Sequence, residues 1–130
     1  MGDKEYVVKD SGERKEFETG AVRDTSTGKG RYDLLPLLAL KSLAELYEKG
    51  AIKYEDNNWL KGIPVSRMMD SAKRHIDQFM LGLEDEDHLI QAVWNLIGAK
   101  EYLLRIELGL LPKELDDLPY ILREKKDDLG

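Results

Sequence analysis

DEDHLIQAVWNLIGAKEYLLRIEL, residues 85–108, is the stretch that decides the fold. Its apolar residues recur at helical spacing, and acidic residues stand at its start, where they complement the helix dipole. The stretch predicts a helix that starts near Asp85–Asp87 and continues to about Leu108, the longest and most apolar in the chain. Such a helix buries its apolar face against other helices, so the sequence favours a mainly α fold.

Two further helices precede this one. The first runs from about Pro36 to Lys49, because proline is favoured at a helix start and Gly50 provides a stop. Ser66 can cap the second, which continues to about Leu81. Both helices have an apolar face that we expect to point inward: Leu37, Leu40, Leu43, Ala44 and Tyr47 on the first, and Met68, Ala72, Ile76 and Phe79 on the second.

The N-terminal region is polar and punctuated by glycine. Residues 6–9 and 15–18 flank Asp10-Ser11-Gly12, which predicts a small β-hairpin, and residues 19–31 predict a loop. At 130 residues the chain predicts a single domain.

The expected order is a β-arm and loop over 1–32, a helical core over 33–109 and a C-terminal extension over 110–130 with a short helix and a mobile tail. The predicted fold is therefore mainly α, a small helical bundle of three main helices with an N-terminal β-hairpin arm and a short C-terminal helix.

Composition excludes several classes of site. The chain has no cysteine and only two histidines, which rules out disulfides, thiolate metal sites and a three-histidine zinc site within one chain. Any metal must rely on carboxylates, which favours Mg²⁺ or Mn²⁺. The net charge of −6 argues against binding to duplex nucleic acid. The longest apolar run, residues 34–40, is too short for a membrane, and no signal segment is apparent, so we expect a cytoplasmic protein without a membrane partner.

Carboxylates supply the candidate metal ligands. Glu45 and Glu48 lie three residues apart on the first helix, so their side chains can share one ligand. A second group, Glu84 to Asp87, stands at the start of the third helix. Ion pairing on a helix surface and complementing the helix dipole are the ordinary roles of such acids, and both alternatives stay open. Two carboxylate groups on separate helices could hold one or two Mg²⁺ ions against a polyphosphate.

The two histidines have different surroundings. His75 lies on the apolar face of the second helix, where a histidine is either a satisfied core residue or a proton donor. His88 begins a polar stripe with Gln91 and Asn95 on an otherwise apolar helix. Because buried polar groups need partners, this stripe indicates an internal hydrogen-bond network or, as we favour, a wall that faces a ligand.

Two loops carry basic and aromatic candidates. The glycine-rich loop before residue 32 has three cations that could cradle phosphates: Arg23, Lys29 and Arg31. The loop over residues 50–64 offers a cation, an amide and two aromatic rings: Lys53, Asn58, Tyr54 and Trp59. Trp59 could stack a base and Asn58 could bond its edge, although a loop tryptophan also commonly fills a core.

Five strings in this order carry a resemblance: GAVRDTSTGKGRYDLLP, AL, YEKGAIKYEDNNWLKG, SAKRHI and EDHLIQAVWNL. From about Phe17 to about Leu104 the chain resembles the phage and bacterial dATP/dGTP diphosphohydrolase family, N-terminal domain type. The resemblance implies metal-dependent hydrolysis of purine deoxynucleoside triphosphates to dNMP and pyrophosphate. The chain also resembles, more loosely, the MazG-type all-α nucleotide pyrophosphatases, which place E-x-x-E and E-x-x-D around Mg²⁺. Glu45-x-x-Glu48 and Glu84-x-x-Asp87 match that pattern.

These resemblances give the candidate residues provisional roles. Glu48, Glu86 and Asp87 would hold the metal, with Glu45 or Glu84 as accessory ligands. Phosphate charge would be neutralised by Lys53, Arg74 and the cations of the glycine-rich loop, and His75 or His88 would donate or shuttle a proton. Base and sugar would be held by Tyr54, Asn58, Trp59 and Asn95. The alternative is a non-catalytic nucleotide- or partner-binding helical module. Apolar faces left uncovered by three helices predict a homo-oligomer.

Overall fold

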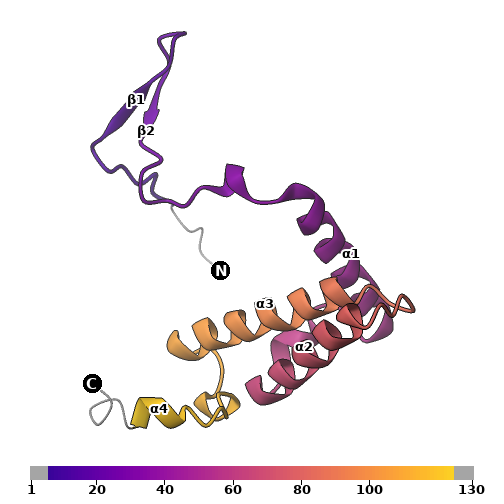
Figure 1. The fold of residues 1–130 in the computed structure, drawn as a ribbon. Coiled ribbons are helices and arrows are strands. Elements are labelled where there is room, and N and C mark those ends of the chain that lie inside the picture. Colours follow the sequence, from indigo (N-terminus) through magenta and orange to yellow (C-terminus); the bar gives the residue numbers. More distant parts are fainter. Residues whose placement is uncertain (1–5, 125–130) are drawn as a thin grey trace. The chain divides into compact units, whose positions relative to one another are not determined.

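Residues 6–124 are described by a computed structural model. The chain is mainly helical, as predicted, with three long helices and a short C-terminal one (Figure 1): α1 (Leu37–Lys53), α2 (Val65–Met80), α3 (His88–Glu107) and α4 (Ile121–Glu124). Two strands, β1 (Arg14–Glu16) and β2 (Val22–Asp24), form the N-terminal antiparallel hairpin. Three short 3₁₀ helices connect these elements: η1 (Tyr32–Leu34), η2 (Asn58–Lys61) and η3 (Lys113–Leu115).

The chain divides into two compact units, one ending at Leu35 and the other starting at Pro36. The β-hairpin belongs to the first unit, and all four α-helices belong to the second. Within residues 6–124, none of the helices combines the length and the apolar character that crossing a membrane requires. The predicted mobile tail falls partly on residues 125–130, outside the described residues.

The hairpin uses later residues than predicted. Arg14 lies opposite Asp24, and Gly20, with φ of +86°, lies in the turn between the strands. Residues 6–9, predicted as the first strand, are exposed and form none, whereas part of the predicted loop becomes β2. The run Asp10-Ser11-Gly12 forms no hairpin turn because its side chains bond elsewhere. The Asp10 carboxylate accepts the N–H of Gly12 at 2.8 Å, and the Ser11 hydroxyl donates to Asp24.

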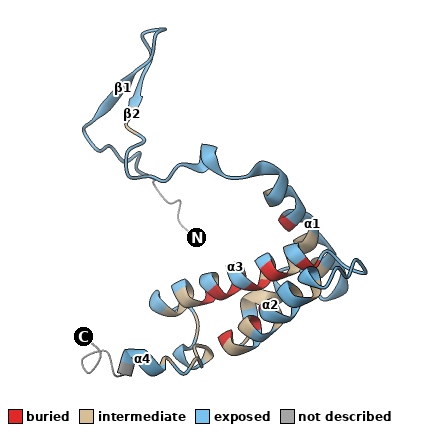
Figure 2. Cartoon of the chain, in the orientation of Figure 1, coloured by how far each residue is buried: buried red, intermediate tan, exposed pale blue. Residues whose placement is uncertain are grey.

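The core of the helical unit lies between α2 and α3. Four buried side chains form it, Val65, Met68, Ala99 and Tyr102, and the buried positions of α3 appear red in Figure 2. Met68 and Ala72 are buried as predicted, but Ile76 and Phe79 are exposed. At that level α2 contacts α3 through His75, whose ring centroid lies 5.2 Å from that of His88. Ile76 and Phe79 therefore stay exposed next to the two histidine rings.

Helix α1 extends further than its glycine suggested. Gly50 keeps helical geometry, and the Tyr54 N–H donates to its carbonyl at 3.0 Å, so the predicted stop at Lys49 is wrong. A glycine ends a helix when it adopts a left-handed conformation, but Gly50 does not, and α1 continues to Lys53 with Tyr54 as its C-cap. On the predicted apolar face Leu43 is buried, Leu40 and Tyr47 are half-buried, and Leu37 and Ala44 are exposed.

The starts of α2 and α3 are capped differently. Ser66 is not the N-cap of α2, which begins at Val65 after Pro64. Instead the Ser66 N–H and hydroxyl donate to the Asp117 carboxylate at 2.8 and 2.6 Å, so the cap comes from the C-terminal segment. Helix α3 begins near the predicted place, with Asp87 as its N-cap.

Candidate functional site

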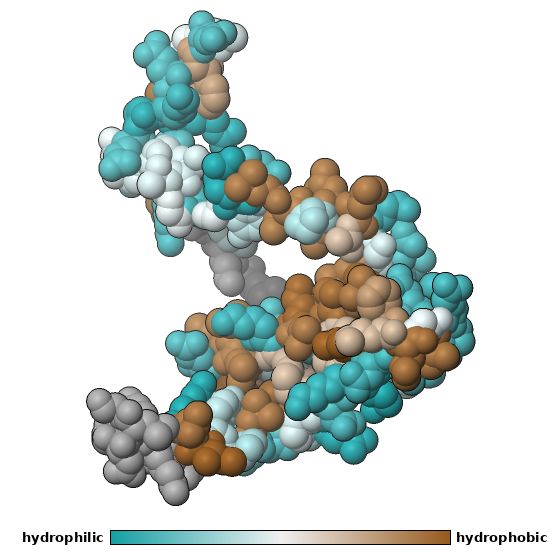
Figure 3. All heavy atoms as spheres, in the orientation of Figure 1, coloured by the Kyte–Doolittle hydropathy of each residue, from teal (hydrophilic) through white to brown (hydrophobic). Residues whose placement is uncertain are grey.

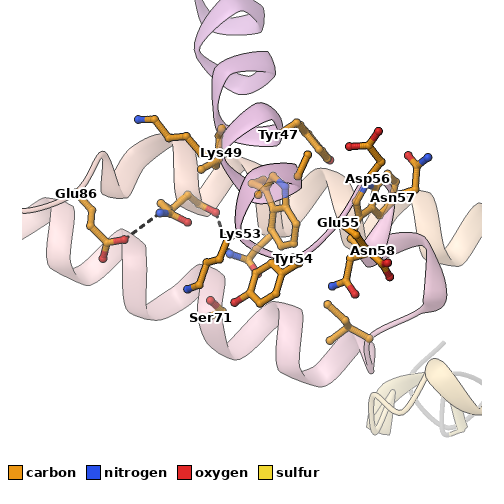
Figure 4. A pocket seen from close by; sticks show the side chains of 18 residues that line it. Tyr47, Lys49, Lys53, Tyr54, Glu55, Asp56, Asn57, Asn58, Ser71 and Glu86 are labelled. Atoms are coloured by element: carbon orange, nitrogen blue, oxygen red, sulfur yellow. Dashed lines mark hydrogen bonds between the residues drawn. The ribbon is translucent and has the colours of Figure 1, made fainter.

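A pocket of about 850 Å³ lies in the helical unit, between the end of α1, the segment around η2 and one side of α3 (Figure 4). Its volume is that of a small-molecule site. Aromatic rings, lysines and amides make up much of its lining: Tyr47, Tyr54, Trp59 and Trp94; Lys49 and Lys53; Asn57, Asn58, Gln91 and Asn95. The pocket therefore offers flat apolar faces together with hydrogen-bonding groups and positive charge.

The aromatic wall is anchored in the core. The ring centroid of Tyr47 lies 5.7 Å from that of Trp59 and 6.0 Å from that of Trp94. Tyr102 lies behind Trp59, with its ring centroid 5.9 Å away and its hydroxyl donating to the Trp59 carbonyl at 2.5 Å. Burial raises the pKa of Tyr102 to about 12. Trp59 thus packs against the core and also lines the pocket, and its stacking on a base stays a prediction.

Polar groups are spread along the pocket. The Lys53 ammonium lies 5.1 Å from the centroid of the Tyr54 ring. Asn95 is buried in α3, where its amide nitrogen donates to the Gln91 carbonyl at 2.9 Å. In Figure 4, Glu86 lies at one end of the pocket, and Asp56 lies at the other. The end with Glu86 is thus suited to a positively charged or metal-bound part of a ligand. The aromatic rings in the middle of the pocket are suited to a planar part.

A smaller pocket of about 270 Å³ adjoins the first. The two share four lining residues: Leu46, Lys49, Glu86 and Gln91. Glu45 of α1 and the turn residues Asp85 and Asp87 also line the smaller pocket, so carboxylates from two elements face one space. Glu45 is exposed and bonds Lys41 at 2.8 Å, which lowers the pKa of Glu45.

The turn before α3 is tied to the helix by each of three consecutive acids. The His88 ring nitrogen Nε2 lies 2.7 Å from Asp85 Oδ1, and this hydrogen bond lowers the pKa of Asp85. Glu86 accepts from the Gln91 amide at 3.1 Å, and Asp87 accepts the N–H of Ile90 at 3.1 Å. Ligand atoms of Asp85, Glu86 and His88 all lie within 4.8 Å of one another, a grouping that could hold a metal ion.

The two histidines form a direct pair. His88 is 2% exposed, and its Nδ1 lies 2.9 Å from Nδ1 of the half-buried His75 on α2. Burial is the main cause that lowers the pKa of His75. Because both ring nitrogens of His88 are engaged, the hydrogen bonds run in a chain from α2 to the acidic turn.

The region that carries this geometry matches a known family. Residues 19–109 match the family described as dATP/dGTP diphosphohydrolase, N-terminal, and this range contains every residue that lines the two pockets. The chain belongs to this family. The resemblance read from the sequence is thereby confirmed. No curated protein and no solved structure matches the chain significantly.

In this member of the dATP/dGTP diphosphohydrolase family, the structure brings half of the predicted residues to the pockets. Lys53, Tyr54, Asn58, Trp59, Glu86 and Asn95 line the larger one, and Glu45, Glu86 and Asp87 line the smaller. Glu48 and Glu84 are exposed and line neither pocket. Arg74 is exposed on α2 and bonds Asp70 at 3.1 Å.

The cations of the N-terminal unit are engaged within that unit. Lys29 pairs with Asp24 at 3.0 Å, and Arg31 forms a two-bond pair with Asp33 at 2.8 Å. Arg23 lies on β2, opposite Lys15. Lys29 and Arg31 therefore have local carboxylate partners, and their binding to phosphate remains a prediction from the sequence.

Sequence reasoning missed several residues of the pockets, among them Tyr47, Lys49, Asp85 and Trp94. Tyr47 shares its helical face with core leucines, so periodicity alone assigns it to the core. A signal for Trp94 was present, because the polar stripe Gln91–Asn95 marks this side of α3 as different from its apolar sides. Asp85 had no signal beyond its place in an acidic run.

Proposed function

We propose that the chain hydrolyses purine deoxynucleoside triphosphates, dATP and dGTP, to the monophosphate and pyrophosphate. The observation that carries the proposal is the junction of the two pockets at Lys49, Glu86 and Gln91. A nucleoside triphosphate has a flat base with a sugar and, beside it, a chain of negative charge that usually carries a divalent cation. An aromatic pocket that opens onto a group of carboxylates offers surroundings for both parts.

The larger pocket supplies the contacts for base and sugar. Trp59 and Tyr54 provide faces on which a base can stack, and Asn58 and Asn95 provide amides for its polar edge. Lys53 and Lys49 bring positive charge toward the shared end of the pockets, where it would offset phosphate charge as the bond to the leaving pyrophosphate breaks. A pocket wall tied to the core keeps these groups in place.

The smaller pocket has the donor set for a hard divalent cation. Glu45, Glu86 and Asp87 are carboxylates, the ligand type that Mg²⁺ and Mn²⁺ prefer. Both ring nitrogens of His88 are already hydrogen-bonded, so the carboxylate oxygens are the groups that would bind the cation. A divalent cation bound here would neutralise phosphate charge and lower the pKa of an attacking water. The chain's own part is to hold these three carboxylates, together with Asp85 and Lys49, around one space.

A product assay tests the proposed reaction. The purified chain would be incubated with each common dNTP and NTP and Mg²⁺ or Mn²⁺, and the products separated by ion-exchange chromatography. We expect monophosphate and pyrophosphate from dATP or dGTP, and no turnover in EDTA. Release of free phosphate or nucleoside would contradict the proposed reaction. Nucleotide binding without turnover in the presence of metal would favour the non-catalytic binding module.

Charge-neutral variants test the proposed ligands. Glu45→Gln and Glu86→Gln should each lower kcat by at least about 100-fold, because each removes a charged donor, while circular dichroism stays unchanged. Glu107→Gln, an exposed acid at the end of α3, is the control. Loss of turnover in Glu48→Gln and Glu86→Gln but not in Glu45→Gln would instead favour the ligand set predicted from the sequence.

We also propose that the protein is a homo-oligomer in which a second copy covers one side of α2 and α3. Apolar side chains there are between 37% and 76% exposed: Ile76, Met80, Leu89, Val93, Leu96 and Leu104. Figure 3 shows hydrophobic side chains gathered over α3. Apolar side chains gathered in this way mark a surface that contacts a partner, whereas apolar residues scattered singly do not. Ser71, Gln91 and Trp94, which line the larger pocket, lie on the other side of these helices.

A further inference from the structure

His88 occupies an unusual place in the helical unit. It follows the acidic turn, residues 84–87, and its side chain is 1% exposed, while the Asp85 side chain that it contacts is 70% exposed. A histidine buried at the first position of a helix satisfies no capping requirement, because Asp87 already accepts the N–H of Ile90. The burial of this ring therefore has another structural reason.

Hydrogen-bond chemistry sets the direction of the chain of contacts. A carboxylate only accepts, so His88 Nε2 carries a proton and donates to Asp85 across 2.7 Å. On the other side, two Nδ1 atoms face each other at 2.9 Å, and one proton must lie between them. The two rings cannot both be imidazolium in this arrangement. His75, on α2, is thus linked through His88 to Asp85, on the turn before α3.

The same turn carries the carboxylates that face the smaller pocket. Glu86 and Asp87 lie between Asp85 and His88 in the chain, and each is tied forward to α3, through Gln91 and Ile90. Those bonds fix the turn at its helical end. The contact from His88 to Asp85 fixes its other end, and His75 holds the His88 ring against α2.

We propose that His88 and His75 are positioning residues that clamp the acidic turn and so hold Glu86 and Asp87 in their metal-binding arrangement. The proposal rests on the proposed function, in which these two acids are ligands. It gives the histidines a role outside the reacting atoms, because neither ring nitrogen of His88 is free to reach a substrate. Removing an outer support of this kind typically lowers metal affinity 10- to 100-fold.

Substitutions at His75 test the clamp without emptying the buried position of His88. His75→Leu removes the nitrogen that faces His88, whereas His75→Asn keeps an amide near the place of Nδ1 and should rescue the contact. Lys73→Leu, at an exposed position on the same helix, is the control. With the full chain and Mn²⁺ alone, we expect His75→Leu to raise the Kd for Mn²⁺ at least about tenfold. His75→Asn and the control should stay within about threefold of wild type, with unchanged circular dichroism.

A second readout separates the clamp from the metal site. Amide hydrogen exchange of residues 84–88 should be faster in His75→Leu and restored in His75→Asn, and a merely packed His75 would not be rescued by asparagine. If the wild type binds Mn²⁺, an equal affinity in His75→Leu would overturn the proposal. If the wild type binds no Mn²⁺, the metal part of the proposed function fails. Amide hydrogen exchange then tests the clamp by itself. Faster exchange of residues 84–88 only in His75→Leu supports the clamp, and equal exchange in all variants overturns it.

Discussion

Tyr102 connects the candidate pocket to the core through a single hydrogen bond. Its ring is fully buried, and its hydroxyl donates to the Trp59 carbonyl. Tyr102→Phe removes one of the two donors to that carbonyl, which also accepts the Gly62 N–H at 3.1 Å, and we expect this loss to cost about 0.5–1.5 kcal/mol of unfolding free energy. Urea denaturation at pH 8 measures this, with the exposed Tyr32→Phe as the control. Equal stability of the two variants would show that the hydrogen bond contributes nothing.

Tyr102 also predicts that the stability of the fold depends on pH in the alkaline range. Burial raises the pKa of Tyr102 from 10.0 to about 12, so the folded state holds this proton more tightly than the unfolded state. The resulting stability is fully present below pH 10 and is lost as the pH rises toward 12. Wild type should therefore lose more stability than Tyr102→Phe over this range, and parallel losses would contradict the assignment.

Residue by residue, local features of the sequence best predicted which side chains line the pockets. Lys53, Tyr54, Asn58 and Trp59 lie close together in the chain, and all four line the larger pocket. Choosing among carboxylates was harder, because a three-residue spacing places Glu45 and Glu48 on one helical face without saying which one meets the turn before α3. The pocket geometry selects Glu45. That choice depends on how α1 packs against α3, which no local pattern contains.

Among the elements, the start of α2 shows how a distant segment replaces a local cap. The sequence offered Ser66 as an N-cap, but Asp117 accepts from both its N–H and its hydroxyl. Asp117→Ala should lower the thermal midpoint, because the Ser66 N–H in the first turn of α2 and the Ser66 hydroxyl both lose their acceptor. Glu114→Ala, exposed in η3, is the control.

The stabilisation by Asp117 should disappear at acidic pH. The hydrogen bonds from Ser66 lower the pKa of Asp117, so its stabilising effect is present above the unfolded value near 3.8 and is lost as the pH falls through the folded value. Thermal midpoints measured between pH 7 and pH 2 should converge for wild type and Asp117→Ala at the acidic end. A constant difference would mean that the charge on Asp117 is irrelevant.

Helices α2 and α3 approach each other closely at Gly98. A Cβ at this position would lie 2.6 Å from the terminal methyl of Met68, which is buried. Alanine gains about 1 kcal/mol of helix propensity but forces Met68 to move within the core, so Gly98→Ala should be near neutral and Gly98→Val should cost about 1–3 kcal/mol. Met68→Ala should relieve the valine clash, giving a coupling above about 0.5 kcal/mol in a urea double-mutant cycle. Additive effects would contradict this contact.

Between elements, predictions failed where the outcome depended on a partner far along the chain. Helix types and approximate positions followed from apolar periodicity, which is a local property. The strand paired with β1 came from residues 22–24 and not from residues 6–9. The Ser11 hydroxyl donates to Asp24, and the Asp10 carboxylate accepts the Gly12 N–H, so these residues do not form the turn that pairing with 6–9 requires. The exposed Ile76 and Phe79 have a similar origin, since His75 occupies the contact with α3 that periodicity assigned to them.

For the whole molecule, the decisive quantity is the apolar surface that one chain leaves uncovered. The α3 residues Leu89, Val93, Leu96 and Leu104 recur at helical spacing and are each about 40–50% exposed, which matches an interface and not scattered surface residues. Because a charge in a buried apolar contact is costly, Leu96→Glu should convert the proposed oligomer to a monomer. Light scattering coupled to size-exclusion chromatography measures the mass directly.

The control for this prediction is Ile52→Glu, which adds the same charge at an exposed position of α1 outside both pockets. It should keep the wild-type mass, and both variants should keep the wild-type circular dichroism because neither side chain belongs to the buried core. A wild-type chain with the mass of one copy at high concentration would contradict the interface. So would an unchanged mass in Leu96→Glu, because the stripe on α3 is then not the surface that the copies share.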